Sequence, residues 1–81
     1  GFVSTTKDAR QAYLDFAIQT AAVAHHFPCE VLMTHSGYAP VGVEREQAFE
    51  WLVEGCKALA AAAAGHGLVV GFEFHPDMFI R

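Results

Sequence analysis

The stretch Leu68–His75, LVVGFEFH, limits most strongly what this chain can fold into. An apolar run with one glycine precedes Glu73, as expected for a β-strand buried on both faces in a parallel sheet. Alternation assigns Leu68, Val70, Phe72 and Phe74 to one face, and Val69, Gly71, Glu73 and His75 to the other. We expect the large side chains to face a helix layer. The acid then lies at the edge where parallel α/β folds bind ligands.

The composition is that of one small and unusually apolar domain. The chain has 81 residues, of which 53% are hydrophobic and 17% charged, against roughly 25% charged in ordinary globular domains. A chain of this length buries only about 60% of its unfolded surface and is expected to be marginal alone. The first residue is Gly1, and Arg81 follows His75 by six positions. We therefore expect residues 1–81 to be a single partial domain, cut from something larger.

Charge and hydropathy argue against several classes of protein. Five basic and nine acidic residues give a formal net charge of −4, and no basic cluster could follow a phosphate backbone, so no nucleic-acid partner is expected. No apolar run approaches the ~20 residues of a membrane span, and no signal peptide is recognisable. We expect a soluble, cytoplasmic chain with no membrane partner. Cys29 and Cys56 form no CxxC pair and are predicted to be free thiols in apolar surroundings.

The first predicted helix covers residues 5–26. Thr5 and Asp8 approximate a capping box at its start. Its apolar stripe is predicted to hold Ala9, Tyr13, Phe16, Ala17, Thr20 or Ala21, and Val23 or Ala24. His25 and His26 fall in the last turn, where they are expected to be capping or surface residues rather than metal ligands.

The remaining elements complete a βαβ unit. Cys29–His35 is predicted to be a strand, and the loop 36–43 after it is typical of a binding rim. The second helix begins at Glu44 and ends at the glycines 65 and 67. Its apolar side is predicted to hold Ala48, Trp51 or Leu52, Gly55, Leu59, and Ala62 or Ala63. Strands joined by such a helix run parallel and usually lie side by side. We therefore expect His35 and Glu73 at the same rim.

An imidazole and a carboxylate at one rim are two potential ligands of zinc, manganese or a similar divalent ion. His75 is a third candidate, or a hydrogen-bond donor to a ligand. A catalytic ion needs three or more protein ligands, and no further acid or histidine stands at a predicted strand end. Simpler interpretations remain open. His35 could hydrogen-bond the following turn, Glu73 could be a rim charge in water, and Asp77, after Pro76, could form a turn.

These motifs resemble those of the xylose-isomerase-like TIM barrels, the sugar phosphate isomerase/epimerase superfamily. VLMTHSG, then a loop and a helix ending in AAAAAGHG, then LVVGFEFHP, is similar to the middle of that barrel, over nearly the whole chain. The resemblance implies an α-β-α-β segment with two parallel strands, from helix 3 to strand 5 of a (β/α)8 barrel. That is about one third of the roughly 250 residues that a barrel needs. The family's His-x-Gly turn corresponds to His35–Gly37, and its metal-binding glutamate to Glu73.

The resemblance also implies a function. It points to a sugar or sugar phosphate isomerase or epimerase of carbohydrate metabolism that depends on a divalent metal, Mn, Mg, Co or Zn. In such enzymes the ion polarises the carbonyl and stabilises the enediolate formed when a carboxylate removes the α-proton. Glu73 is implied as metal ligand and catalytic residue, His35 as a metal or substrate ligand, and His75 and Tyr38 as substrate contacts. The family's other ligands lie on later strands, so the 81 residues alone are expected to be inactive.

Two alternatives stay open. In the related endonuclease-IV-like branch, His35 and Glu73 would both bind zinc and the substrate would be an abasic phosphodiester. Basic residues along the rim would favour that branch, and none lies between Gly37 and Glu44. The other alternative is a non-catalytic, truncated α/β module. Because a two-stranded sheet has open edges and uncovered faces, the isolated chain is expected to be unstable or to self-associate, unless the remainder of the barrel covers it.

Overall fold

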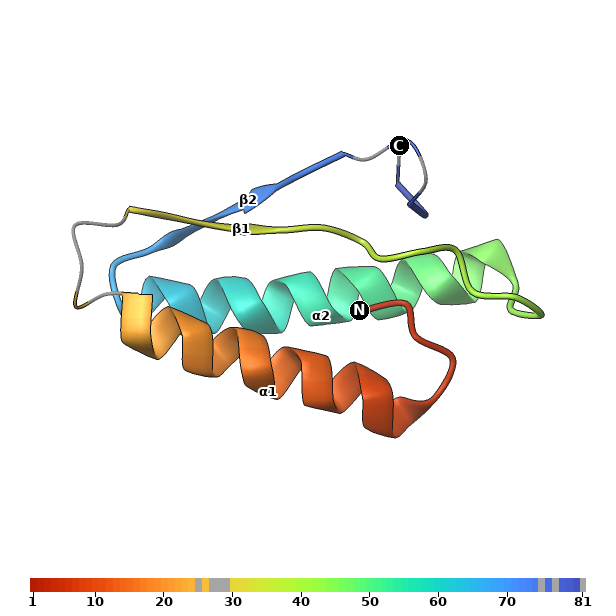
Figure 1. Ribbon diagram of the computed structural model, residues 1–81, viewed down its shortest axis with the longest axis horizontal. Helices are drawn as coiled ribbons and strands as arrows, with labels where there is room; N and C mark the ends of the chain where they lie inside the picture. Colours follow the sequence, from red (N-terminus) through yellow and green to blue (C-terminus); the bar gives the residue numbers. More distant parts are fainter. Residues whose placement is uncertain (25, 27–29, 75, 77, 81) are drawn as a thin grey trace.

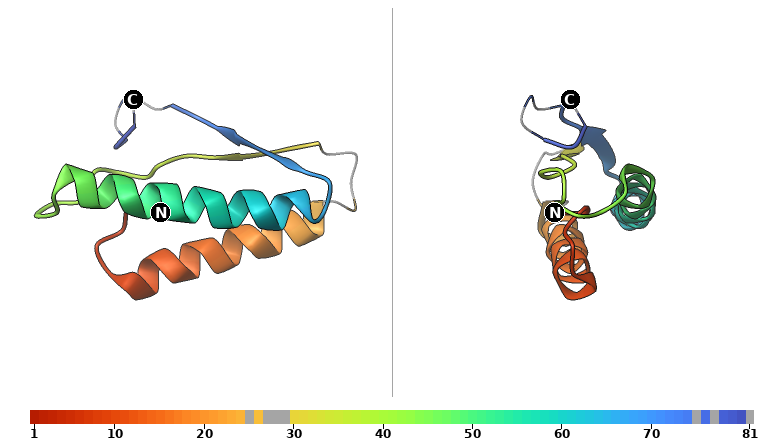
Figure 2. Two further views of the ribbon diagram at one scale, coloured as in Figure 1. Left: turned by 180° about the vertical axis from the view of Figure 1, so that it is seen from behind. Right: turned by 90° about the vertical axis from the view of Figure 1, so that its right-hand side faces the viewer.

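The computed structural model describes all residues except 25, 27–29, 75, 77 and 81. In chain order it contains the helix α1 (Lys7–Ala24), the strand β1 (Val31–Thr34), the helix α2 (Arg45–Ala64) and the strand β2 (Val69–Phe72). Both helices lie on the same side of the two strands, so the molecule has two layers (Figures 1 and 2). The predicted order of helix, strand, helix and strand is confirmed, with each element somewhat shorter than predicted.

β1 and β2 pair directly and in parallel, as the βαβ interpretation predicts. Val31 lies opposite Val69, and Thr34 lies opposite Phe72. Each residue of β1 therefore pairs with the residue 38 positions later in the sequence. One further ladder bond follows β2, in which the Glu73 N–H donates to the Thr34 carbonyl at 2.8 Å. The register between β1 and β2 is therefore fixed as far as Glu73, a residue of the predicted site.

The sheet has one covered and one open face. Leu68 is buried, and Val70 and Phe72 pack against the core, as alternation predicts. On the opposite face at least half of each side chain of Val31, Met33 and Val69 is exposed. The expectation of a strand covered on both faces is thus wrong for the described chain, because its two helices cover the same face.

Phe74 also departs from the expected pattern. It was assigned to the helix-facing side of β2, yet it is 68% exposed. Phe74 lies two positions past the end of β2, where the ladder no longer holds the backbone against the helix layer. Its ring makes an edge contact with Phe72, with the ring centroids 5.6 Å apart.

The two helices enclose the core against the sheet. The apolar side of α2 is as predicted, and its buried residues are Ala48, Leu52, Leu59 and Ala63. The predicted stripe of α1 is only partly right, since Phe16 and Val23 are 67% and 59% exposed. Of the predicted stripe, Tyr13, Ala17 and Ala21 meet the core, together with Leu14 and Ile18, which lie outside that stripe.

The ends of α1 differ from prediction by one or two residues. Its cap is Thr6 rather than Thr5, because the Thr6 Oγ1 accepts the Ala9 N–H at 3.2 Å and satisfies one of the free donors of the first turn. The helix ends at Ala24, and His26 is an exposed turn residue beyond it, in keeping with the surface role expected for it. His25 lies outside the described residues.

The N-terminal segment supplies core residues that the sequence did not reveal. Phe2 and Val3 are almost fully buried, at 2% and 1% exposure. The Phe2 ring meets Tyr13 edge to face, with the centroids 4.7 Å apart. It also packs against the bare backbone of Gly55 in α2, where a Cβ atom would overlap the ring. Gly55 therefore allows the segment to insert between the helices.

We predict that Gly55→Ala destabilises the fold, although alanine favours helices. Helix propensity alone would stabilise by about 1 kcal/mol, but overfilling a packed core costs typically about 1–3 kcal/mol. Urea unfolding followed by circular dichroism should show a lower midpoint. Glu54→Ala, an exposed neighbour on the same helix, should leave the midpoint nearly unchanged. An equal loss from Gly55→Ala in wild-type and Phe2→Leu backgrounds would contradict a contact between Phe2 and Gly55.

Cys56 is a free thiol that packs against the core, as predicted. Cys29 lies outside the described residues. Burial raises the pKa of the Cys56 thiol, because it disfavours the charged thiolate. The folded state therefore holds the thiol proton more tightly than the unfolded chain does. The stabilising contribution of the thiol is complete at neutral pH and is lost as the pH rises through the unfolded pKa, about 8.5, toward the raised folded value.

In a Cys29→Ser variant, we predict that Cys56 reacts more slowly with an aromatic disulfide reagent when folded than in urea, since the thiolate is the nucleophile. The free energy of unfolding should also fall between pH 8 and 10. The matched variant that carries Cys56→Ala in addition should lack that part of the decline. Equal rates in the folded and unfolded states would show that the core does not shield the thiol.

Candidate functional site

His35 and Glu73 occupy equivalent places at the ends of the two strands. His35 directly follows β1, and Glu73 directly follows β2. The offset of 38 positions that pairs Val31 with Val69 also pairs 35 with 73. Because the strands are parallel, both residues lie at the same edge of the sheet, as predicted.

Alternation along the strands predicts which face of the sheet the two side chains occupy. A Cβ atom on Gly71 would meet the side chains of Met33 and Val31, which places these three residues on the open face. Alternation would carry His35 after Met33, and Glu73 after Gly71, onto that face. In the structure the His35 side chain is partly buried and lines a hollow with Gly1 and Val3, and Glu73 is exposed at the rim.

The His35 side chain is partly buried and carries an unsatisfied nitrogen. Its Nδ1 atom is buried and has no hydrogen-bond partner among the described residues. A buried polar atom without a partner costs about 1–3 kcal/mol, so such an atom calls for a partner such as a water molecule or an ion. Nδ1 therefore makes no hydrogen bond to the described residues of the following turn.

Glu73 is exposed at the rim, and its backbone is held although its carboxylate is open. The ladder bond from its N–H to Thr34 fixes the residue relative to β1. Thr34 is itself buried, and its Oγ1 lies 3.1 Å from the Tyr13 hydroxyl of α1. A rigid backbone with an open carboxylate suits a ligand of an ion and a rim charge equally well.

The loop after β1 forms a hollow beside His35. The hollow measures about 380 Å³, and its lining includes Tyr38, Pro40 and Met78. Tyr38, predicted to contact substrate, is 69% exposed. The N-terminal residues Gly1, Val3, Ser4 and Thr5 complete the lining. Sequence patterns gave no signal for these four, because they reach the rim only through the insertion of Phe2 between the helices.

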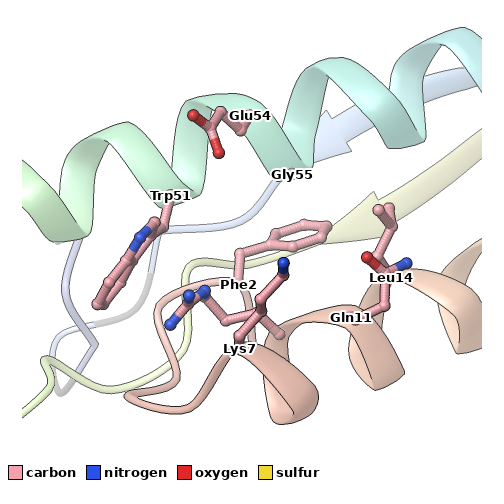
Figure 3. A pocket seen from close by; sticks show the side chains of 8 residues that line it. Phe2, Lys7, Gln11, Leu14, Trp51, Glu54 and Gly55 are labelled. Carbon is pink, nitrogen blue, oxygen red and sulfur yellow. The ribbon is translucent and has the colours of Figure 1, made fainter.

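A second hollow lies between the helices and shares none of the predicted site residues (Figure 3). The Arg10 guanidinium stacks on the Trp51 ring, 3.8 Å from its centroid. Arg10 also donates hydrogen bonds to the carbonyls of Ser4 and Thr5. This hollow therefore belongs to the packing of the N-terminal segment rather than to the rim.

Among the described residues, no group of three or more His, Cys, Asp and Glu side chains is placed to hold an ion. His35 and Glu73 are thus two donors, of types that zinc and manganese accept. His75, the third candidate, lies outside the described residues, as does Asp77. In the same part of the chain, neither α1 nor α2 has the length and apolar character needed to cross a membrane.

The comparison with protein families agrees with this geometry. A family model described as xylose isomerase-like TIM barrel matches residues 1–81. The chain belongs to this family, and the resemblance inferred from its motifs is confirmed. Neither the curated proteins nor the solved structures include a significant match. The α/β arrangement, with two adjacent parallel strands and helices on one side, is that of consecutive units of such a barrel.

Gly37 holds the turn that follows His35 in a left-handed backbone conformation, with φ at +82°. We predict that Gly37→Ala destabilises by about 1–2 kcal/mol because a Cβ atom is strained there, while Gly37→Asn costs less. Gly65→Ala is the matched control, since Gly65 has φ at −62°. Differential scanning calorimetry would measure the unfolding temperatures of Gly37→Ala, Gly37→Asn and Gly65→Ala. A loss in Gly65→Ala as large as that in Gly37→Ala would refute the backbone explanation.

Proposed function

We propose that this chain forms part of the active site of a cytoplasmic sugar or sugar phosphate isomerase or epimerase that depends on a divalent metal. The observation that carries the proposal is the placement of His35 beside Glu73 at the ends of adjacent parallel strands. In (β/α)8 barrels the carboxyl ends of the strands form the active site. Membership of the xylose isomerase-like family supports the same class of reaction.

The proposed roles follow from the chemistry of the side chains. Glu73 would bind the ion through its carboxylate and is the candidate to accept a substrate proton, because it is exposed at the rim. His35 would offer its buried and unpaired Nδ1, or contact the substrate. Tyr38 and His75 would contact the sugar. When bound, an ion such as Mn, Mg, Co or Zn would polarise the substrate carbonyl.

The described residues hold two strands, whereas a complete barrel has eight. The remaining ligands would therefore come from further strands, and the 81 residues alone would be inactive. Those strands would extend the sheet and place Val31, Met33 and Val69 in the barrel interior. Without them, the open face and edges favour self-association.

The endonuclease-IV-like alternative uses the same two ligands with an abasic phosphodiester as substrate. Binding of a phosphodiester needs cationic side chains near the ion. The rim loop from Gly37 to Glu44 contains no lysine or arginine. Arg10 stacks on Trp51 between the helices, and Arg45, which follows the loop, stacks on the Phe79 ring. The isomerase class is therefore the better supported proposal.

A Mn²⁺ titration of the ¹⁵N-labelled chain tests the metal-binding part of this proposal. Paramagnetic Mn²⁺ should broaden the backbone amide signals of His35 and Glu73 together and before those of α1. Glu73→Gln should abolish the selective broadening, because the amide is a much poorer ligand than the carboxylate. Glu54→Gln, an exposed substitution on α2, should leave it intact. If Glu73→Gln responds as the wild type does, the non-catalytic module is the correct interpretation.

A further inference from the structure

Ser36 joins two segments that are far apart in the sequence. Its side chain is fully buried, with 0% exposure. The Oγ atom donates to the Gly37 carbonyl at 2.9 Å and accepts the Ile80 N–H at 3.0 Å, across 44 positions. The Gly37 carbonyl also accepts the Phe79 N–H at 2.8 Å. The turn after β1 is thereby bonded to the segment that follows β2.

That segment is anchored by packing as well. Phe79 is buried at 5% exposure within the core cluster. The Arg45 guanidinium, in the first turn of α2, lies 4.8 Å from the centroid of its ring. The chain that carries Glu73 is therefore held on one side by the ladder bond to Thr34, and on the other by the contacts of Phe79 and Ile80.

We propose that Ser36 is a positioning residue for the site formed by His35 and Glu73, an inference that rests on the proposed function above. Ser36 adjoins His35 in the chain, and its hydroxyl is bonded to the segment that follows Glu73. A hydroxyl suits this place because it can donate and accept at once. It ties the turn that carries His35 to the segment after Glu73, in addition to the ladder bond that holds Glu73 itself.

A purely structural serine and a positioning serine differ in what their removal changes. Ser36→Ala leaves His35 and Glu73 intact but deprives the Ile80 N–H of its acceptor. If Ser36 only stabilises the fold, metal affinity should follow overall stability. If it positions the ligands, the Mn²⁺ affinity of Ser36→Ala should fall further than that of another variant that loses the same stability.

The experiment measures the Mn²⁺ concentration that half-saturates the broadening of the His35 and Glu73 amides. In Ser36→Ala we expect it to rise about tenfold, the lower end of the effect of removing groups that orient metal ligands. Ser36→Thr, which keeps the hydroxyl, should stay closer to the wild type. Leu68→Val, a buried substitution directly before β2, is the control for lost stability and should change the value less than about twofold.

Ile80→Pro provides a second route, because it removes the N–H donor and leaves Ser36 in place, and it also removes a side chain that packs against the core. It should raise the half-saturating Mn²⁺ concentration as Ser36→Ala does, and it replaces that variant if Ser36→Ala fails to fold. The positioning role would be overturned if Ser36→Ala and Ile80→Pro bound Mn²⁺ with the same affinity as Leu68→Val. Absence of selective broadening in the wild type would instead overturn the proposed metal site itself.

Discussion

The parallel pairing of β1 with β2 is the constraint on which the rest of the molecule depends. The α2 crossover returns the chain so that residues 38 positions apart lie opposite one another. This single register decides which side chains enter the core and which reach the open face. It also sets His35 beside Glu73, since both follow directly after a paired strand. A slip of one position would turn β2 over and bury its exposed side chains.

Around this pairing, the two ends of the chain are fitted to the rim by close packing. Phe2 inserts against Gly55, and Phe79 is buried near the first turn of α2. The first contact brings Ser4 and Thr5 to the hollow beside His35, and the second brings the backbone of Ile80 to Ser36. The site is thus bounded by segments with no regular secondary structure, which are held in place by buried aromatic rings.

Periodic features of the sequence predicted the fold well, and single long-range contacts explain what they missed. The spacing of Ala48, Leu52 and Leu59 gave the buried side of α2, and alternation gave the covered face of β2. The rim pair followed from element order alone. Phe2 and Ser36 could not be found in this way, because each contacts a partner more than 40 positions distant, Gly55 for Phe2 and Ile80 for Ser36. Phe16 was misassigned because two neighbouring stripes of α1 are apolar and only packing selects one.

The stacking of Arg10 on Trp51 determines what the tryptophan fluorescence of this molecule reports. Trp51 is the one tryptophan of the sequence, and it lines the hollow between α1 and α2 with Phe2 and Lys7 (Figure 3). Its emission therefore reports the docking of α1 and the N-terminal segment on α2. The rim holds tyrosine and histidine but no tryptophan among its described residues. Tryptophan emission would therefore follow the closure of the helix layer rather than events at the strand ends.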